Sequence, residues 1–365
     1  MNSSPPRPRN PAISRRMAMI CSSGCNEHRT PDRTSRKLTP PAVPRRGAGA
    51  LAMLMLTASA ACAAPIRVVT TTPGYADIVR QIGGSRVSVQ SVMRGPENVH
   101  NVSPTPSKMM KLKRAKLFIH SGLDAEPWAP LLVKGAHNPR LLPGREGNVD
   151  VSRGIELKQV PKGGQLSRAL GDIHVYGNPH YALDPLNVIR IARTITDALK
   201  QTEPRYAKEF ESRYRTYAEH LRRRTQQWVA RMQPYRGTPV VTYHRTWPYF
   251  LDRFGLVSIG EVEPKPGITP SPRHLVECAE RMRSEGAKVV IVETFNSRKN
   301  AESVARRVGG KAVVLAQEVK ALPGIDTYEQ LFEYNISRLI ETFQAVGIQP
   351  RTTAVTEPPP QKAGR

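Results

Sequence analysis

The chain has 365 residues, of which 39% are hydrophobic, and it carries 55 Lys and Arg against 30 Asp and Glu. At about 100–200 residues per domain this length predicts two globular domains, and the hydrophobic fraction excludes a chain that is disordered throughout. No apolar run reaches the ~18–20 residues of a membrane-spanning helix, so we expect a soluble mature protein. Four cysteines are too few and too scattered for a disulfide framework.

The first 63 residues are expected to precede the folded protein. Residues 1–46 hold ten Lys and Arg against two acidic residues, without apolar periodicity, and are predicted to be a disordered or misassigned leader. Residues 47–63 follow two arginines and combine a short apolar stretch with an Ala-x-Ala site, the pattern of a secretory signal peptide. We therefore expect export to the periplasm with cleavage after Ala63. A lipoprotein anchored at Cys62 is the alternative, which Ser59 disfavours because a lipobox has Leu there.

Short β-branched runs alternate with helical stretches from Ile66 onward. The strands expected in the first half are residues 66–70, 87–92, 117–119 and 148–151, and the helices between them lie near 76–81, 107–114 and 126–136. Asp184-Pro185 opens a further helix, with Asp as the N-cap and Pro at the first helical position. Residues 205–232 then form a helical run without Gly or Pro, roughly 40 Å long at about 1.5 Å per residue.

The second half repeats the alternation. Its expected strands are 240–243, 256–259, 288–292 and 312–315, and its expected helices are 247–254, 272–285, 300–308 and 327–345. This order predicts an α/β fold of two lobes, each with a roughly four-stranded parallel sheet flanked by helices, joined by one long linking helix. We assign the first lobe to 64–203, the linking helix to 204–234, the second lobe to 235–349 and a disordered tail to 350–365.

Three histidines and one glutamate stand where such sheets bind ligands. His100 follows the second expected strand across a turn, His244 directly follows the fifth strand, and His180 directly precedes a helix. Glu293 follows the seventh strand, and ligands of α/β sheets bind at the carboxyl ends of strands. The histidines are too far apart for any local zinc motif, so a site must form between the lobes. Imidazoles with a carboxylate suit Zn²⁺, and less exclusively Mn²⁺ or Fe²⁺.

Several segments resemble a known family. Residues 172–185, which include Gly-Asn-Pro-His180-Tyr-Ala-Leu-Asp-Pro, resemble the second-ligand motif of the zinc and manganese solute-binding proteins of metal ABC transporters, the cluster A-I or cluster 9 receptors. Residues 95–100 look like the first-ligand loop of that family, and the segment at His244 is similar to its third-ligand motif. The resemblance covers residues 66 to about 348. It implies two lobes, a rigid linking helix, an interlobe metal site and delivery of the metal to a membrane permease.

The fourth ligand is where the chain departs from the family. The best-known members have an Asp upstream of the closing Tyr, whereas this chain reads Ala-Gln-Glu318 and has no Asp until Asp326. We predict Glu293 as the fourth ligand because it emerges at the same sheet edge as His244. The alternative is that Glu293 only orients His244 or caps the next helix, and Glu318 is its rival for the ligand position.

The expected function is that of an extracytoplasmic receptor that captures Zn²⁺, and less readily Mn²⁺, and hands it to an ABC permease. The alternative is a metal-dependent hydrolase, but no residue is placed as a general base, so we do not expect an enzyme. We expect a monomer, and no nucleic-acid binding, because the positive charge is mixed with Glu and forms no basic stripe among aromatics. His174 is either an auxiliary metal-capture residue or a loop hydrogen-bond residue. Metal binding should weaken as pH falls through about 6.5, because ligating imidazoles must be neutral.

Overall fold

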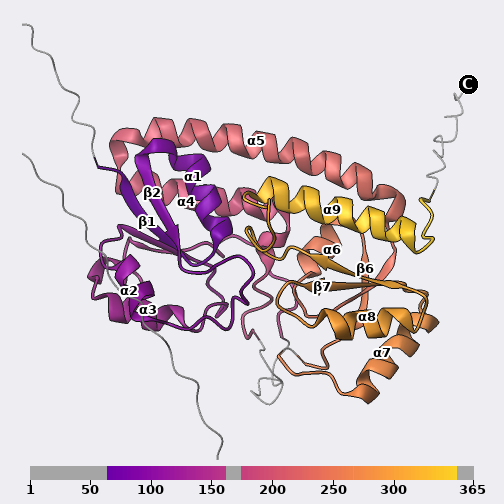
Figure 1. The fold of residues 1–365 in the computed structure, drawn as a ribbon. Coiled ribbons are helices and arrows are strands. Elements are labelled where there is room, and N and C mark those ends of the chain that lie inside the picture. The colour runs from indigo at the N-terminus through magenta and orange to yellow at the C-terminus, as the bar shows by residue number, and fades with distance from the viewer. Residues whose placement is uncertain (1–63, 162–173, 266, 352–365) are drawn as a thin grey trace, which may run out of the picture. The chain divides into compact units, whose positions relative to one another are not determined.

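The computed structural model describes residues 64–161, 174–265 and 267–351 (Figure 1). Every described residue belongs to one compact unit of the chain. The expected leader, signal peptide and most of the C-terminal tail lie outside the described residues. Within those residues, no helix combines the length and the apolar character needed to cross a bilayer.

Four parallel strands form the sheet of the first lobe, in the order β2-β1-β3-β4. They are β1 (Ile66–Thr70), β2 (Val87–Ser91), β3 (Leu117–His120) and β4 (Asn148–Asp150). The helices of this lobe are α1 (Pro73–Gly83), α2 (Pro106–Leu112), α3 (Ala129–Ala136) and α4 (Pro185–Thr202). Because strand side chains alternate between faces, Val68 packs with α1 and α4 while its neighbour Val69 packs with α2 and α3. Both faces of the sheet are therefore covered.

The second lobe repeats this topology with strand order β6-β5-β7-β8, all parallel. Its strands are β5 (Pro239–Thr242), β6 (Val257–Glu261), β7 (Val289–Glu293) and β8 (Lys311–Leu315). Its helices are α6 (Pro248–Phe254), α7 (Pro272–Ser284), α8 (Arg298–Arg306) and α9 (Tyr328–Ala345). The predicted fold class, two lobes with four-stranded parallel sheets, is confirmed. Cys278 is a buried free thiol on α7.

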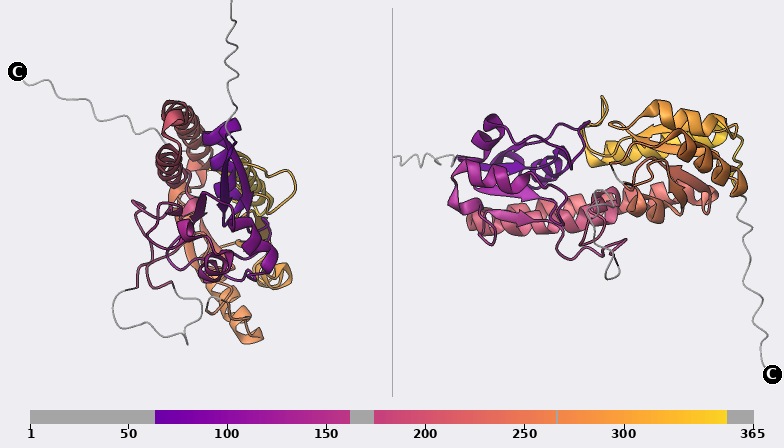
Figure 2. Two further views of the ribbon diagram at one scale, coloured as in Figure 1. Left: turned by 90° about the vertical axis from the view of Figure 1, so that its left-hand side faces the viewer. Right: turned by 90° about the horizontal axis from the view of Figure 1, so that it is seen from below.

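The helix α5 (Ala207–Met232) links the lobes. It packs against α1 and α4 of the first lobe and against α6 and α9 of the second, and Figures 1 and 2 show it extending along both. One hydrophobic cluster continues from α1 and α4 through α5 into α9, so the helix shares its core with both lobes. This continuous packing makes α5 a strut rather than a flexible tether.

Polar contacts also connect the lobes. The Asp77 carboxylate on α1 accepts a hydrogen bond of 3.0 Å from the backbone N–H of Tyr328, the first residue of α9. Asp184, the predicted N-cap of α4, accepts from Leu186 N–H at 2.9 Å and also binds Arg253 of α6 through two hydrogen bonds of 2.8 Å. These contacts hold α1 against α9 and α4 against α6.

Candidate metal centre

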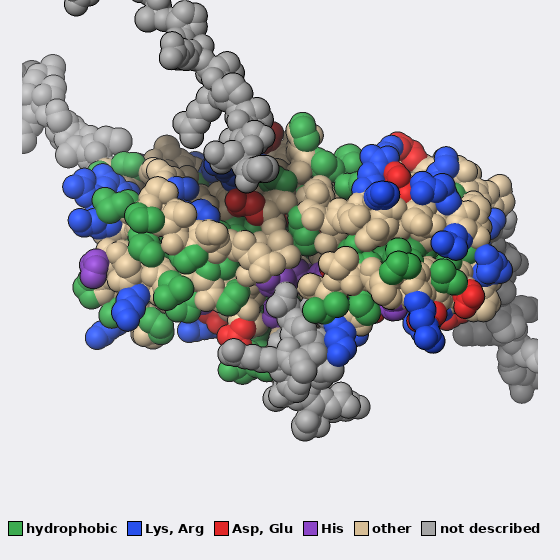
Figure 3. All heavy atoms as spheres, turned by 60° about the horizontal axis from the view of Figure 1, so that its bottom comes forward, with side chains coloured by type: hydrophobic (Ala, Val, Ile, Leu, Met, Phe, Trp, Pro, Cys, Tyr) green, Lys and Arg blue, Asp and Glu red, His purple; other side chains and the backbone are tan. Residues whose placement is uncertain are grey.

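The three histidines predicted from the sequence lie together. His100, His180 and His244 each offer one ring nitrogen, and these three atoms lie within 4.8 Å of one another. The Nε2 atoms of His100 and His180 are 3.4 Å apart, and Figure 3 shows histidine side chains gathered at the middle of one face. In the ranges 64–161, 174–265 and 267–351, no other group of three metal-binding side chains converges in this way.

Asparagine side chains hold the first two loops in place. Asn98 Oδ1 accepts from the backbone N–H of His100 at 3.0 Å, and Asn178 Oδ1 accepts from that of His180 at 2.9 Å. In both loops the side chain folds back onto the N–H two residues later, which fixes a tight turn before the histidine. Asn178 Nδ2 also donates to the carbonyl of Arg245 at 2.7 Å, so the loop of the second histidine is bonded to the loop of the third.

Hydrogen bonds at the other ring nitrogen set the tautomers. His100 Nδ1 lies 3.0 Å from the carbonyl oxygen of Ala125, and His244 Nδ1 lies 2.7 Å from Glu263 Oε2. Since a carbonyl and a carboxylate only accept, each Nδ1 carries a proton, and in the neutral imidazole the lone pair is then on Nε2. Carboxylate–histidine pairs of this kind orient metal ligands and raise their basicity. Glu263 was missed in the sequence, where nothing but its position just beyond a strand marks it.

Replacing Glu263 by glutamine is expected to lower zinc affinity about 10- to 100-fold, because Gln still accepts from Nδ1–H but removes the negative charge that makes His244 more basic. The measurement is a competition titration against a chelator of known affinity. Glu261→Gln is the matched control, since Glu261 lies two residues away and pairs with Arg245 at 3.6 Å, not with a histidine of the cluster. Equal losses in both variants would contradict a specific role for Glu263.

Burial keeps the second histidine neutral. Loss of solvation, followed by the proximity of His100 and His244, holds the pKa of His180 well below its ordinary value of 6.5. The same causes lower the pKa of His174 to about 3. Both imidazoles are therefore neutral at physiological pH, the state in which they can bind a metal ion.

Glu293 does not join the histidines. Its side chain is buried at the end of β7, where Oε1 accepts from the Trp247 indole at 2.6 Å and Oε2 accepts from Asn296 Nδ2 at 2.8 Å. Burial raises the pKa of this carboxyl group. Hydrogen bonds within its own lobe engage both oxygens, and Glu293 lies outside the three-histidine group, so its role as the fourth ligand stays a prediction.

Glu318 borders the site from the second lobe. With His180, Thr72 and Tyr75 it lines a cavity of about 50 Å³, which is large enough for an ion or a few waters but not for an organic ligand. Its Oε1 accepts from Val319 N–H at 2.7 Å and, across the lobes, from Gly74 N–H at 2.9 Å. Burial raises its pKa to about 7. Glu318 therefore holds the second lobe against the start of α1, and it too lies outside the three-histidine group.

His120, which ends β3, is held by hydrogen bonds outside the histidine cluster. Its Nε2 pairs with Asn148 Oδ1 at 2.9 Å, and its Nδ1 accepts from Gly122 N–H at 3.1 Å.

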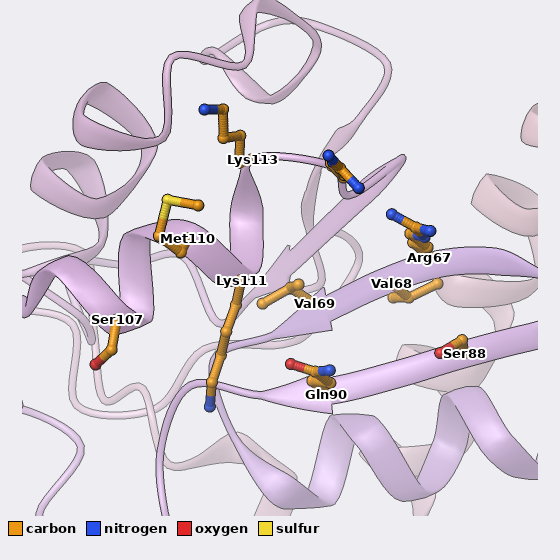
Figure 4. A pocket seen from close by; sticks show the side chains of 10 residues that line it. Arg67, Val68, Val69, Ser88, Gln90, Ser107, Met110, Lys111 and Lys113 are labelled. Atoms are coloured by element: carbon orange, nitrogen blue, oxygen red, sulfur yellow. The ribbon is translucent and has the colours of Figure 1, made fainter.

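A larger cavity of about 510 Å³ lies over β1 and β2 (Figure 4), and the cations that line it are Arg67, Lys111, Lys113 and Arg114. This second cavity repels a divalent cation.

The fold and the histidine cluster together define a two-lobed α/β protein with a candidate metal centre between its lobes. The chain belongs to the family described as zinc-uptake complex component A, periplasmic (ZnuA), whose model matches residues 68–342.

Individual relatives are distant. The zinc-binding protein AdcA of Streptococcus pyogenes is 24% identical over 263 residues, 69% of this chain and 50% of that protein, so the chain spans about half the length of these streptococcal relatives. A putative metal-binding protein of Treponema pallidum is 22% identical over 275 residues, 74% of this chain and 85% of that protein. A crystal structure of ZnuA superimposes with a TM-score of 0.65 at 22% identity, covering 76% of this chain and 99% of that one. FpvC of Pseudomonas aeruginosa, solved with Ni²⁺, gives 0.64 at 23% identity, covering 78% and 99%. These structures share the fold.

Proposed function

We propose that this protein is a periplasmic receptor that captures a divalent metal ion between its lobes, Zn²⁺ in preference to Mn²⁺, and delivers it to the membrane permease of an ABC transporter. The observation that carries the proposal is the convergence of His100, His180 and His244, contributed by both lobes, to within 4.8 Å. Export through the signal peptide at 47–63 would bring the chain to that compartment, where we propose that it acts as a monomer.

The chemistry of the site favours reversible capture. Imidazole nitrogens suit Zn²⁺ better than Mn²⁺, which prefers oxygen ligands. Because the ligands come from two lobes, separating the lobes would divide the ligand set and lower the affinity for the ion, which provides a route to release. The chain belongs to a family of periplasmic components of zinc-uptake complexes, and we propose that it has no catalytic activity.

The test is metal analysis of the protein purified without chelators, followed by titration of the metal-free protein with Zn²⁺ and Mn²⁺. We expect one zinc ion per chain, tighter binding of zinc than of manganese, and no hydrolysis of ester or amide substrates. Absence of stoichiometric metal binding would contradict the receptor function, and metal-dependent turnover would indicate an enzyme instead.

Zinc binding is expected to release fewer protons than three ordinary histidines would. Three free imidazoles of pKa about 6.5 would together release about 1.5 protons at pH 6.5. Because the pKa of His180 is lowered, this ligand is already neutral at that pH and releases none, so we expect about one proton or fewer. Proton competition at His180 begins only at lower pH, below the window expected from the sequence. Calorimetric titration in buffers of different ionisation enthalpy measures this number, and a value near 1.5 would contradict the prediction.

A further inference from the structure

We infer that His174 supplies a fourth imidazole to the bound metal ion, so that four histidines hold the ion rather than three histidines and a carboxylate. This inference rests on the proposed function, since it concerns the ligand set of the same site. It adds a residue from the first lobe that lies six positions before His180 in the sequence.

The position of His174 is the first observation. Its ring centroid lies 4.6 Å from that of His100 and 6.4 Å from that of His180. The ring centroids of His100 and His180 are 5.2 Å apart, and those of His180 and His244 are 5.9 Å apart. The His174–His100 distance is therefore shorter than either of these two distances within the cluster. A turn brings it there: the His174 carbonyl accepts from Gly177 N–H at 3.2 Å, and Gly177 has a φ of 115° that a side chain would disfavour.

The second observation is an unpaired nitrogen. The Nε2 atom of His174 is buried, and among the described residues it has no hydrogen-bond partner. Nearly all buried polar atoms in proteins are hydrogen-bonded, and leaving one unpaired costs free energy. A metal ion at the neighbouring cluster would bind this lone pair and so explain the unpaired atom.

The carboxylates around the site are already engaged. Glu293 accepts from Trp247 and Asn296, Glu318 accepts from Gly74 and Val319, and Glu263 accepts from His244. Binding of the ion by Glu293 would disturb buried hydrogen bonds at both of its oxygens, and the two backbone N–H groups bonded to Glu318 both donate to Oε1. Recruiting His174 Nε2 disturbs no hydrogen bond.

His174 lies outside the group whose nitrogens are all within 4.8 Å, so its side chain has to turn toward the ion on binding. Side-chain rotamer changes of this kind are common when proteins bind a partner, even where the backbone moves little. The inference therefore predicts a small local rearrangement at His174 and none at Glu293.

A ligand set of four imidazoles has a consequence for selectivity. Neutral nitrogen ligands suit Zn²⁺ and the later transition metals, whereas Mn²⁺ favours carboxylate and water oxygens. Losing one imidazole should therefore weaken zinc binding more than manganese binding.

The experiment compares His174→Ala with His274→Ala in the full-length protein. His274 is the matched control, because its Nε2 is also buried without a hydrogen-bond partner among the described residues, but it lies on α7. We expect His174→Ala to lower zinc affinity by more than about 100-fold, as for loss of a ligand, and manganese affinity less, while His274→Ala changes neither. Glu293→Gln and Glu318→Gln are titrated alongside and should each retain zinc affinity better than His174→Ala.

X-ray absorption of the zinc-loaded proteins provides a second readout that a folding defect would not imitate. We expect four imidazole ligands in the wild type and three in His174→Ala, at one zinc ion per chain in both. Unchanged affinity in His174→Ala, or three imidazoles plus a carboxylate in the wild type, would overturn the inference while leaving the receptor function intact. A wild type that binds no zinc would overturn both, and is distinguished by its empty absorption spectrum.

Discussion

Replacing His180 by alanine is expected to lower zinc affinity by more than about 100-fold. Loss of a residue that only orients a ligand costs about 10- to 100-fold in metal affinity, so loss of a ligand should cost more. The Nε2 atom of His180 lies 3.4 Å from that of His100, and the loop of His180 is bonded to the carbonyl of Arg245 through Asn178. Competition titration with a chelator of known zinc affinity measures the loss.

The control for this variant is His120→Ala. His120 belongs to the same lobe and is partly buried, but both of its ring nitrogens are hydrogen-bonded outside the cluster. We expect His120→Ala to lower stability modestly and to leave zinc affinity within about threefold of the wild type. If the two variants lost affinity equally, or if the triple variant of His100, His180 and His244 still bound zinc, the three-histidine site would be refuted.

The three histidines could be found in the sequence because their positions along the chain determine where they lie. In a parallel sheet all strands end at one edge, so a residue just beyond a strand must emerge there whatever its neighbours are. His244, directly after β5, satisfies this rule, and His100 follows β2 across a turn. Parallel strands and helices that flank each sheet followed from the same alternation of strands and helices, which is why the fold class was predictable.

The direction of a side chain at that edge could not be predicted in the same way. Glu293 does end β7, as expected, but its carboxylate is held by Trp247 and Asn296, which follow β5 and β7. Whether an acid at a strand end faces the cleft or its own core depends on such tertiary neighbours. Glu263 escaped notice for the converse reason, since its importance comes from a contact with His244 that no local pattern encodes.

Helix boundaries were predicted less well than helix positions. The first helix begins at Pro73, three residues before its predicted start, because Thr72 caps it by accepting from Tyr75 N–H and Pro73 occupies the first helical position. The third helix begins at Ala129 rather than at residue 126, because Glu126 is buried and hydrogen-bonded to Ser121. Because of capping in the first case and burial in the second, each of these helices starts about one turn away from its predicted first residue.

Replacing Trp228 by alanine is expected to have the second large effect, on stability rather than on metal binding. Trp228 lies on the linking helix α5 and is fully buried; its indole N–H donates to Glu333 Oε2 at 2.9 Å, and its ring centroid lies 5.4 Å from that of Phe332 on α9. Removing such a side chain leaves a cavity between the two helices and costs about 3–5 kcal/mol.

Urea unfolding followed by circular dichroism, with and without Zn²⁺, tests this prediction and separates folding from binding. Trp228→Ala should unfold at lower urea concentration in both conditions, while the stabilisation added by zinc stays the same, because zinc binds the native state at His100, His180 and His244. Trp228→Phe keeps most of the packing, loses only the hydrogen bond to Glu333, and should cost about 1–2 kcal/mol. His180→Ala should show the opposite pattern, near-normal stability without zinc and little stabilisation by zinc.

The contradicting result would be a Trp228→Ala protein that remains folded but is no longer stabilised by zinc. Metal capture would then depend on the α5–α9 packing itself, and the linking helix would be part of the binding mechanism rather than only its support.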